Sequence, residues 1–158
     1  MREMLLLNIA RRDEKPGGVE TILTIKVRNV SVGVHELTHL AAPTSGIMHA
    51  HIWDASYRRL GIGMVSYVKA LRRFFDRCGL EQILFATPSH NVAARRVKER
   101  LGIRPVGTGV LRWPIMTKPV ETISYRVLRA EMPMLERNMR EQWQIRRLER
   151  PEALIANP

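Results

Sequence analysis

The sequence predicts an α/β domain with a central mixed β-sheet flanked by helices. Apolar runs of strand length occupy much of residues 4–53, a strand–turn–helix unit follows over residues 46–78, and a strand–helix unit covers residues 82–102. With 158 residues and 45% hydrophobic content, the chain can form one hydrophobic core.

The first part of the chain is predicted to consist of strands. These strands cover residues 4–10, 21–27, 30–37 and 47–53. Arg28 and Asn29 form the tight turn between the second strand and the third. No convincing amphipathic helix precedes Arg58.

The segment from Gly46 to Gly63 predicts a strand, a short polar turn and a helix that opens at Ile62. The first N–H groups of a helix lack intrahelical partners, and together with the positive end of the helix dipole they suit a diphosphate. Gly61 and Gly63 let the main chain approach the phosphate oxygens, while Arg58 or Arg59 adds charge-assisted hydrogen bonds. We expect this turn to be open to solvent.

Two helices frame the next strand. Apolar residues at helical spacing predict a helix over residues 62–78 with Gly79 as its C-cap, followed by a strand over residues 82–87. A second helix is predicted within residues 89–102, with Ser89 or Asn91 as its N-cap. Strands over residues 106–113 and 122–128 and a helix over residues 133–150 complete the chain.

Two motifs in this order resemble the GCN5-related N-acetyltransferase (GNAT) superfamily. Residues 58–63 fit its Gln/Arg-x-x-Gly-x-Gly/Ala motif, and residues 91–103 fit its Asn-x-x-Ala/Ser-x-x-Val/Leu-x-x-x-x-Gly-Phe segment, with Ile103 replacing the aromatic residue. Residues 96–102 are most similar to the branch that acetylates ribosomal-protein N-termini, and residues 121–129 are similar to the last strand of that branch.

The resemblance implies an acetyltransferase that uses acetyl-CoA as co-substrate and transfers its acetyl group to a primary amine by direct attack. Residues 1–130 would form the acetyl-CoA-binding domain, and residues 131–158 a C-terminal helical extension. The backbone of Ile52 and Trp53 would bind the pantetheine arm, and Asn91 would contact it or only cap its helix. The diphosphate would be held by Arg58, Arg59, Leu60, Gly61, Ile62, Gly63 and Met64.

Direct attack requires a neutral amine and therefore a base. Strand alternation places His49 and His51 on one face, and Glu36 is the carboxylate expected to reach the same cleft. Each of the three could instead be an ordinary hydrogen-bonded or solvated side chain. Many GNAT members carry a tyrosine that protonates the departing thiolate, and Lys98 occupies that position here. A lysine could stabilise the thiolate if it points inward, but a solvent-exposed helix face is the favoured expectation, and the general acid stays open.

The predicted N-terminal part is shorter than in the family, which usually places two helices between its first two strands. An abbreviated substrate lobe, a fragment, or a wall supplied by a partner would each account for this difference. The acceptor side of the site is therefore expected to be open. The added C-terminal helix could cover the sheet, replace the missing wall or pair with another subunit in a homodimer, and packing against its own chain or a dimer mate is favoured.

Composition narrows the remaining function classes. No apolar run is long enough to span a membrane, no Cys/His spacing resembles a metal site, and a single Cys78 cannot form an internal disulfide, which fits a cytoplasmic protein. The net charge of +11 is compatible with nucleic acid or a ribosome as partner, or with a solvated basic surface. The alternative to an enzyme acting on a protein or small-molecule amine is a non-catalytic protein that kept the GNAT scaffold and binds nucleic acid or a protein through this surface.

Overall fold

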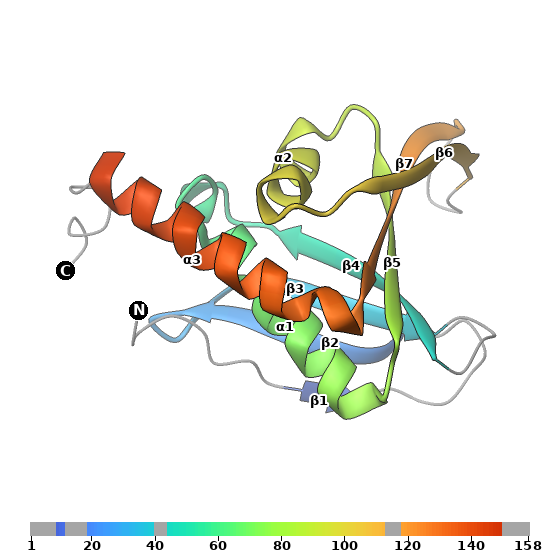
Figure 1. Ribbon diagram of the computed structural model, residues 1–158, viewed down its shortest axis with the longest axis horizontal. Helices are drawn as coiled ribbons and strands as arrows, with labels where there is room; N and C mark the ends of the chain where they lie inside the picture. Colours follow the sequence, from blue (N-terminus) through green and yellow to red (C-terminus); the bar gives the residue numbers. More distant parts are fainter. Residues whose placement is uncertain (1–8, 12–18, 40–43, 113–117, 150–158) are drawn as a thin grey trace.

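The computed structural model describes residues 9–11, 19–39, 44–112 and 118–149 of the chain. They form a seven-stranded mixed sheet in the order β1-β2-β3-β4-β5-β7-β6, together with three α-helices (Figure 1). The strands are β1 (Ile9–Arg11), β2 (Val19–Val27), β3 (Val30–His39), β4 (Ser45–Ile52), β5 (Gln82–Pro88), β6 (Pro105–Leu111) and β7 (Val120–Leu128). The helices are α1 (Ile62–Cys78), α2 (Val92–Leu101) and α3 (Met132–Glu149), with short 3₁₀ turns η1 (Ala55–Tyr57) and η2 (Arg129–Glu131).

The hairpin between β2 and β3 follows from its turn residues. Arg28 and Asn29 both have positive φ, at 47° and 66°. Two successive left-handed residues form a type I′ turn, whose twist matches that of the flanking antiparallel strands. The predicted tight turn is therefore confirmed. Of the first predicted strand, residues 4–8 lie outside the described residues.

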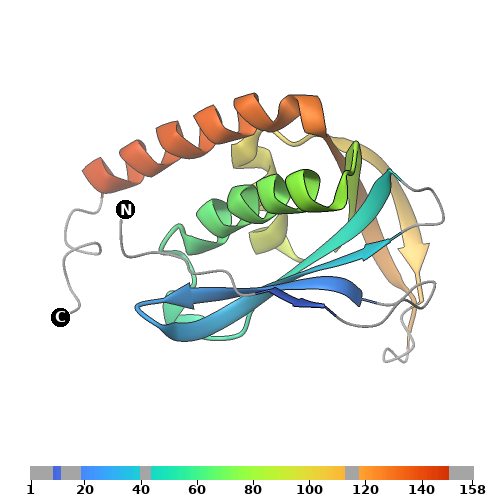
Figure 2. The same ribbon diagram turned by 90° about the horizontal axis from the view of Figure 1, so that it is seen from below.

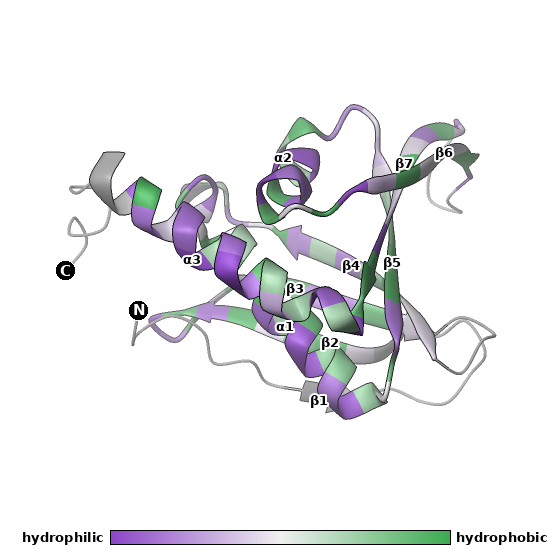
Figure 3. Cartoon of the chain, viewed as in Figure 1, coloured by the Kyte–Doolittle hydropathy of each residue, from purple (hydrophilic) through white to green (hydrophobic). Residues whose placement is uncertain are grey.

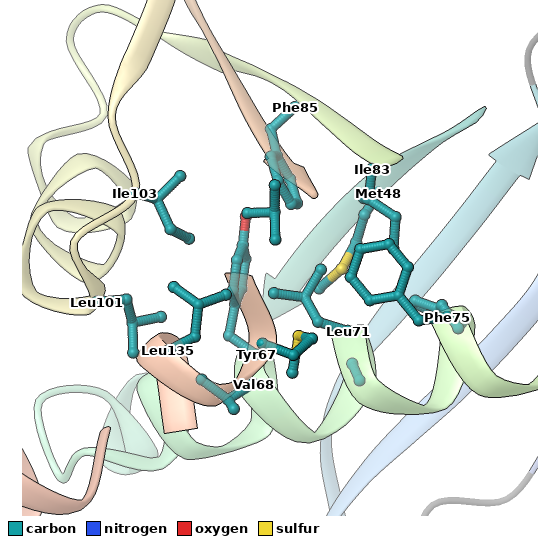
Figure 4. Close-up of a cluster of buried hydrophobic side chains, with 14 of the residues drawn as sticks. Met48, Tyr67, Val68, Leu71, Phe75, Ile83, Phe85, Leu101, Ile103 and Leu135 are labelled. Carbon is teal, nitrogen blue, oxygen red and sulfur yellow. The ribbon is translucent and has the colours of Figure 1, made fainter. Parts of the chain in front are cut away.

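The helix α1 begins and ends where the sequence predicts. Gly61 and Gly79 flank it with left-handed φ values of 83° and 63°. Its buried face includes Tyr67, Leu71 and Phe75, which pack against the sheet in the main core (Figure 4). In Figure 3 hydrophobic and hydrophilic residues alternate along α1, which is typical of a helix that is buried on one face.

The helix α2 is capped by Asn91, whose side-chain oxygen accepts a hydrogen bond from the Ala94 N–H at 3.1 Å. Of the two caps that the sequence allowed, this is the one formed. Gly102 ends the helix with a φ of 79°. The chain then enters β6, the outermost strand beyond β7.

The helix α3 packs against its own chain, on α1 and α2. Figure 2 shows α1 lying between α3 and the strands β1–β4. Met132 and Leu135 of α3 are fully buried in the same core cluster as α1 and β5. Arg72 of α1 donates two hydrogen bonds to the Glu136 carboxylate, at 2.9 and 2.7 Å. The added helix is thus part of the core and forms an outer layer over α1 rather than covering the sheet.

Among the described residues that precede α1, strands β1–β4 and the single turn η1 are the only regular elements. This arrangement agrees with the prediction of a shortened N-terminal part. The helices lie on one side of strands β1–β4, as Figure 2 shows.

Replacing Leu135 with Ala should lower the free energy of unfolding by about 2–5 kcal/mol, because a fully buried leucine leaves a cavity. Urea unfolding followed by circular dichroism measures the change. Ile145→Ala is the control, since Ile145 lies on the same helix at 46% exposure and should change stability by under about 0.5 kcal/mol. Equal effects of the two substitutions would show that α3 is not part of the core.

Candidate active site

The sheet opens between its two central parallel strands. Pairing of β4 with β5 runs through three residue pairs, Ser45–Gln82, Gly46–Ile83 and Ile47–Leu84. Beyond Ile47 and Leu84 the two strands diverge, as Figure 1 shows. The result is a wedge at the carboxyl ends of β4 and β5, and α1 begins just past the end of β4.

Backbone groups of β4 face this wedge. The Trp53 N–H donates to the Val32 carbonyl of β3 at 3.1 Å, so the backbone of Trp53 faces away from β5. Backbone hydrogen-bonding groups alternate between the two edges of a strand. Ala50 and Ile52, which lie past the last pair with β5, therefore direct their N–H and C=O groups toward the wedge.

The facing edge of β5 is arranged in the same way. The Ser89 N–H donates to the Glu121 carbonyl at 2.8 Å, toward β7. By the same alternation, Ala86, which lies past the last pair with β4, presents its backbone groups to the wedge. Such edges need a partner, and an extended ligand that carries amides can supply one in the manner of an added strand.

A turn with two left-handed residues connects β4 to α1. Arg59 has a φ of 65° and Gly61 a φ of 83°, while the Asp54 side chain accepts hydrogen bonds from Ser56 and stabilises the preceding η1 turn. Hydrogen bonding to Ser56 is the main cause of the lowered pKa of Asp54. The turn delivers the first N–H groups of α1, at Ile62 and its successors, to the mouth of the wedge.

This turn is covered on one side, where the sequence led us to expect an open loop. Gly61 is buried, and a Cβ built on it would lie 2.9 Å from Cζ3 of Trp143 in α3. The Arg146 guanidinium also reaches the turn and donates to the Arg59 carbonyl at 2.8 Å. The side chains of Arg58 and Arg59 remain exposed on the other side. Sequence reasoning missed these α3 contacts because no local pattern links α3 to the turn.

Arg58 holds the end of β4. Its guanidinium donates to the Ile52 carbonyl at 3.2 and 3.0 Å and lies 3.4 Å from the Trp53 carbonyl. The side chain thus sits between the wedge-facing edge of β4 and the turn. It places a fixed positive charge at the junction of the two.

The three predicted catalytic side chains come together on one face of the sheet. Glu36 of β3 lies opposite His49 of β4, and Val34 opposite His51, in antiparallel register. Glu36 is half-buried, whereas both histidines are exposed. With Val34 and Ala50 they line a shallow hollow. Their neighbours His35 and Leu37 point to the opposite face and into the core, so the hollow lies on the side away from α1.

A third histidine, His35, is buried on the helix side. Its Nε2 lies 3.0 Å from the Ser66 hydroxyl, which donates in turn to the Gly63 carbonyl at 3.1 Å. Burial lowers the pKa of His35 to about 3. This histidine stays neutral at physiological pH and links β3 to the first turn of α1.

Lys98 points inward, contrary to the expectation of a solvent-exposed position. Its residue is 4% exposed, and its Nζ lies 5.2, 5.4 and 5.3 Å from the ring centroids of Tyr67, Phe85 and Tyr125. Three aromatic faces compensate in part for the lost hydration of the ammonium. Burial still lowers the pKa of Lys98 to about 8. The helical period explains why Lys98 points inward. Residues three or four apart lie on the same face of a helix, and Lys98 is four residues after the half-buried Ala94 and three before the buried Leu101.

Tyr67 is a second buried polar group in this cluster that the sequence did not reveal. Its hydroxyl has no hydrogen-bond partner among the described residues. Burial, with a smaller contribution from Tyr125, raises the pKa of Tyr67 well above its ordinary value. The ring lies 5.3 Å from Phe85, which is the first residue of β5 past the last pair with β4. Tyr67 and Lys98 therefore border the wedge at the point where the strands separate.

Comparison with solved structures identifies this architecture. The chain matches Mycobacterium smegmatis RimJ in complex with CoA-disulfide with a TM-score of 0.67 and 17% identity, over 77% of this chain and 59% of that one. The chain has the GNAT fold. Ribosomal-protein-S5-alanine acetyltransferase from Vibrio fischeri matches with a TM-score of 0.61 and 16% identity, over 68% of this chain and 61% of that one. The spermidine/spermine N-acetyltransferase SpeG from Vibrio cholerae matches with a TM-score of 0.63 and 17% identity, over 73% of this chain and 70% of that one.

The chain spans about three fifths of the length of two of these structures: it covers 59% of RimJ and 61% of the S5-alanine acetyltransferase. No family model matches the sequence, and comparison with curated proteins gives no significant match. Within the described residues, every helix is too short or too polar to cross a membrane.

Gly61→Ala should destabilise the protein by about 1–3 kcal/mol, because alanine pays for the left-handed φ and collides with Trp143. Gly79→Ala is a matched control: its φ is +63° and nothing lies within 4 Å of the added Cβ, so only the backbone cost applies. Thermal unfolding of both variants isolates the packing contribution at Gly61. If the two variants lose the same stability, Trp143 does not press on the turn.

Proposed function

We propose that this protein transfers an acetyl group from acetyl-CoA to a primary amine by direct attack of the amine on the thioester. The observation that carries the proposal is the wedge between β4 and β5, with the turn that opens α1 at its mouth. An extended arm of amides can pair with the exposed strand edges, and a diphosphate at its end can meet the free N–H groups of α1. The fold and both sequence motifs support this assignment.

The pantetheine arm would lie along the wedge-facing edge of β4. Of the two residues that the resemblance assigns to it, Ile52 faces the wedge, whereas the Trp53 N–H is engaged by Val32. The diphosphate would bind at residues 58–64. Arg58 bonds to the Ile52 carbonyl, so its guanidinium is placed to exchange that carbonyl for a phosphate oxygen. Asn91, besides capping α2, would approach the arm from the β5 side.

Glu36, His49 and His51 would provide the base that keeps the attacking amine neutral. They lie on β3 and β4 beside the wedge and are accessible from solvent. Attack forms the new N–C bond and breaks the C–S bond, so that a proton leaves the amine and a thiolate departs. The base would accept the proton directly or through water.

Lys98 would stabilise the departing thiolate. With a pKa of about 8 it is mostly protonated at neutral pH, and it lies beside Phe85 where the strands part. A cation in a desolvated setting interacts strongly with developing negative charge. In this role Lys98 takes the place of the tyrosine that many GNAT members use.

A protein N-terminus or side-chain amine is our first choice of acceptor, with a small amine second. The hollow at Glu36, His49 and His51 is shallow and exposed, which suits a chain end presented by a larger partner. A protein acceptor also suits the net charge of +11, because a ribosome or another acidic assembly would attract such a surface. We further propose a cytoplasmic location, with residues 1–130 as the cofactor-binding unit and residues 131–158 as the helical extension.

Titration calorimetry with acetyl-CoA, followed by thiol release with peptides and polyamines, tests the function. We expect saturable binding and turnover with at least one amine class. Among Glu36→Gln, His49→Ala and His51→Ala, at least one should lower kcat by about 10²–10⁴-fold at neutral pH and recover at high pH, where the amine is already neutral. His90→Ala, at an exposed histidine outside the hollow, is the control. Unchanged rates for all three at every pH would remove the proposed base.

Lys98→Met should raise stability and abolish most turnover. Removing a buried ammonium should add roughly 1–3 kcal/mol at pH 7. Between about pH 8 and 10.5 the unfolded chain retains a proton at Lys98 that the folded protein releases, so wild-type stability rises with pH there. The variant should lack this rise. Chemical unfolding at several pH values measures it, and a destabilised or fully active variant would contradict the proposed role.

The second candidate is a non-catalytic GNAT-fold protein that binds nucleic acid or a protein through its basic surface. The net charge of +11 favours it. Absence of acetyl-CoA binding, together with RNA affinity that falls steeply with salt, would select this alternative.

A further inference from the structure

We propose that the last turns of α3 brace the diphosphate-binding turn, with Arg146 as the positioning residue that sets its affinity for coenzyme A. The inference rests on the proposed function and concerns the same site. It assigns a role to the C-terminal helix that neither sequence motif contains.

The first contact fixes the backbone of the turn. Arg146 Nη1 donates to the Arg59 carbonyl at 2.8 Å. Arg59 has a φ of 65°, a left-handed conformation that costs a non-glycine residue on the order of 1 kcal/mol or more. A charged donor on that carbonyl holds the Arg59–Leu60 peptide plane in place. The turn thus keeps a strained shape through a residue far along the chain.

The second contact fixes the next peptide. Trp143 Cζ3 and Cε3 lie 2.9 and 3.2 Å from the position of a Gly61 Cβ, and Arg146 Cδ lies at 3.6 Å. The indole thus packs directly on the backbone of Gly61, the N-cap of α1. Because a bound anion requires several N–H groups aimed at one point, a turn that is already held in shape loses less entropy on binding.

The brace is firm because α3 is anchored along its length. Met132 and Leu135 are fully buried, and Glu136 accepts two hydrogen bonds from Arg72. Asn138 donates to the Leu101 carbonyl at the end of α2, at 2.9 Å. Figure 2 shows α3 passing over α1 toward the segment that precedes it. The position of the turn is therefore tied to the core through α3.

Charge adds to the effect. The Arg146 guanidinium binds the Arg59 carbonyl of the turn, and the Arg58 guanidinium binds the Ile52 carbonyl just before it, so two positive charges flank the segment that leads into α1. Their combined field favours an anion at this place.

The test compares Arg146→Gln with Arg140→Gln, an exposed arginine of α3, so that each variant loses one positive charge. We expect Arg146→Gln to weaken coenzyme A binding at least tenfold in titration calorimetry and Arg140→Gln less than twofold. Arg146→Lys should recover most of the affinity, since an ammonium can donate to the same carbonyl. Hydrogen exchange of residues 58–64 without coenzyme A should quicken in Arg146→Gln alone.

The outcomes are distinguishable. If the wild type fails to bind coenzyme A, the proposed function is wrong. Unchanged hydrogen exchange of residues 58–64 in Arg146→Gln would independently show that Arg146 does not stabilise the turn. If the wild type binds and Arg146→Gln binds equally well, the brace is overturned while the function stands. Tighter binding by Arg146→Gln would also overturn it, because α3 would then obstruct the turn.

Discussion

The parting of β4 and β5 is the constraint around which the rest of the molecule is arranged. Two neighbouring strands in the middle of a sheet normally satisfy each other, yet here the pairing stops at Ile47 and Leu84. The side chains of Tyr67, Phe85 and Lys98 pack together on the helix side of the sheet, at the point where the strands part. The backbone N–H and C=O groups past these residues lose their partners in the neighbouring strand, which costs free energy unless water or a ligand pairs with them. An extended ligand that carries amides can supply such partners.

Two buried ionisable groups, His35 and Lys98, lie on the helix side of the sheet. Burial lowers the pKa of both His35 and Lys98, so the fold carries a desolvation cost at each. His35 forms a hydrogen bond with Ser66 through Nε2 and thereby joins β3 to α1, while its buried Nδ1 has no partner among the described residues. Among the described residues, the Lys98 ammonium is next to three aromatic rings and makes a long 3.5 Å contact with the Ala94 carbonyl. A buried lysine with a lowered pKa at the edge of the wedge is a candidate functional residue.

Most of the fold could be predicted because its signals are local. The glycines that flank α1, the Arg28-Asn29 turn and the apolar spacing of each helix act within a few residues, and the structure confirms them. Features that depend on distant segments could not be predicted. The inward position of Lys98 depends on rings from α1, β5 and β7, and the cover over Gly61 depends on α3. The structure places Glu36, His49 and His51 side by side, and their catalytic roles stay a prediction.

The placement of the helices separates the two substrates of the proposed reaction. The turn that would hold the diphosphate is braced by α3 on the helix side, whereas Glu36, His49 and His51 lie on the opposite face of β3 and β4. Cofactor binding would thus depend on the core, because α3 is anchored there through Leu135. The acceptor would meet exposed strand residues instead. Selectivity for the amine would then come from what the acceptor itself brings to that face.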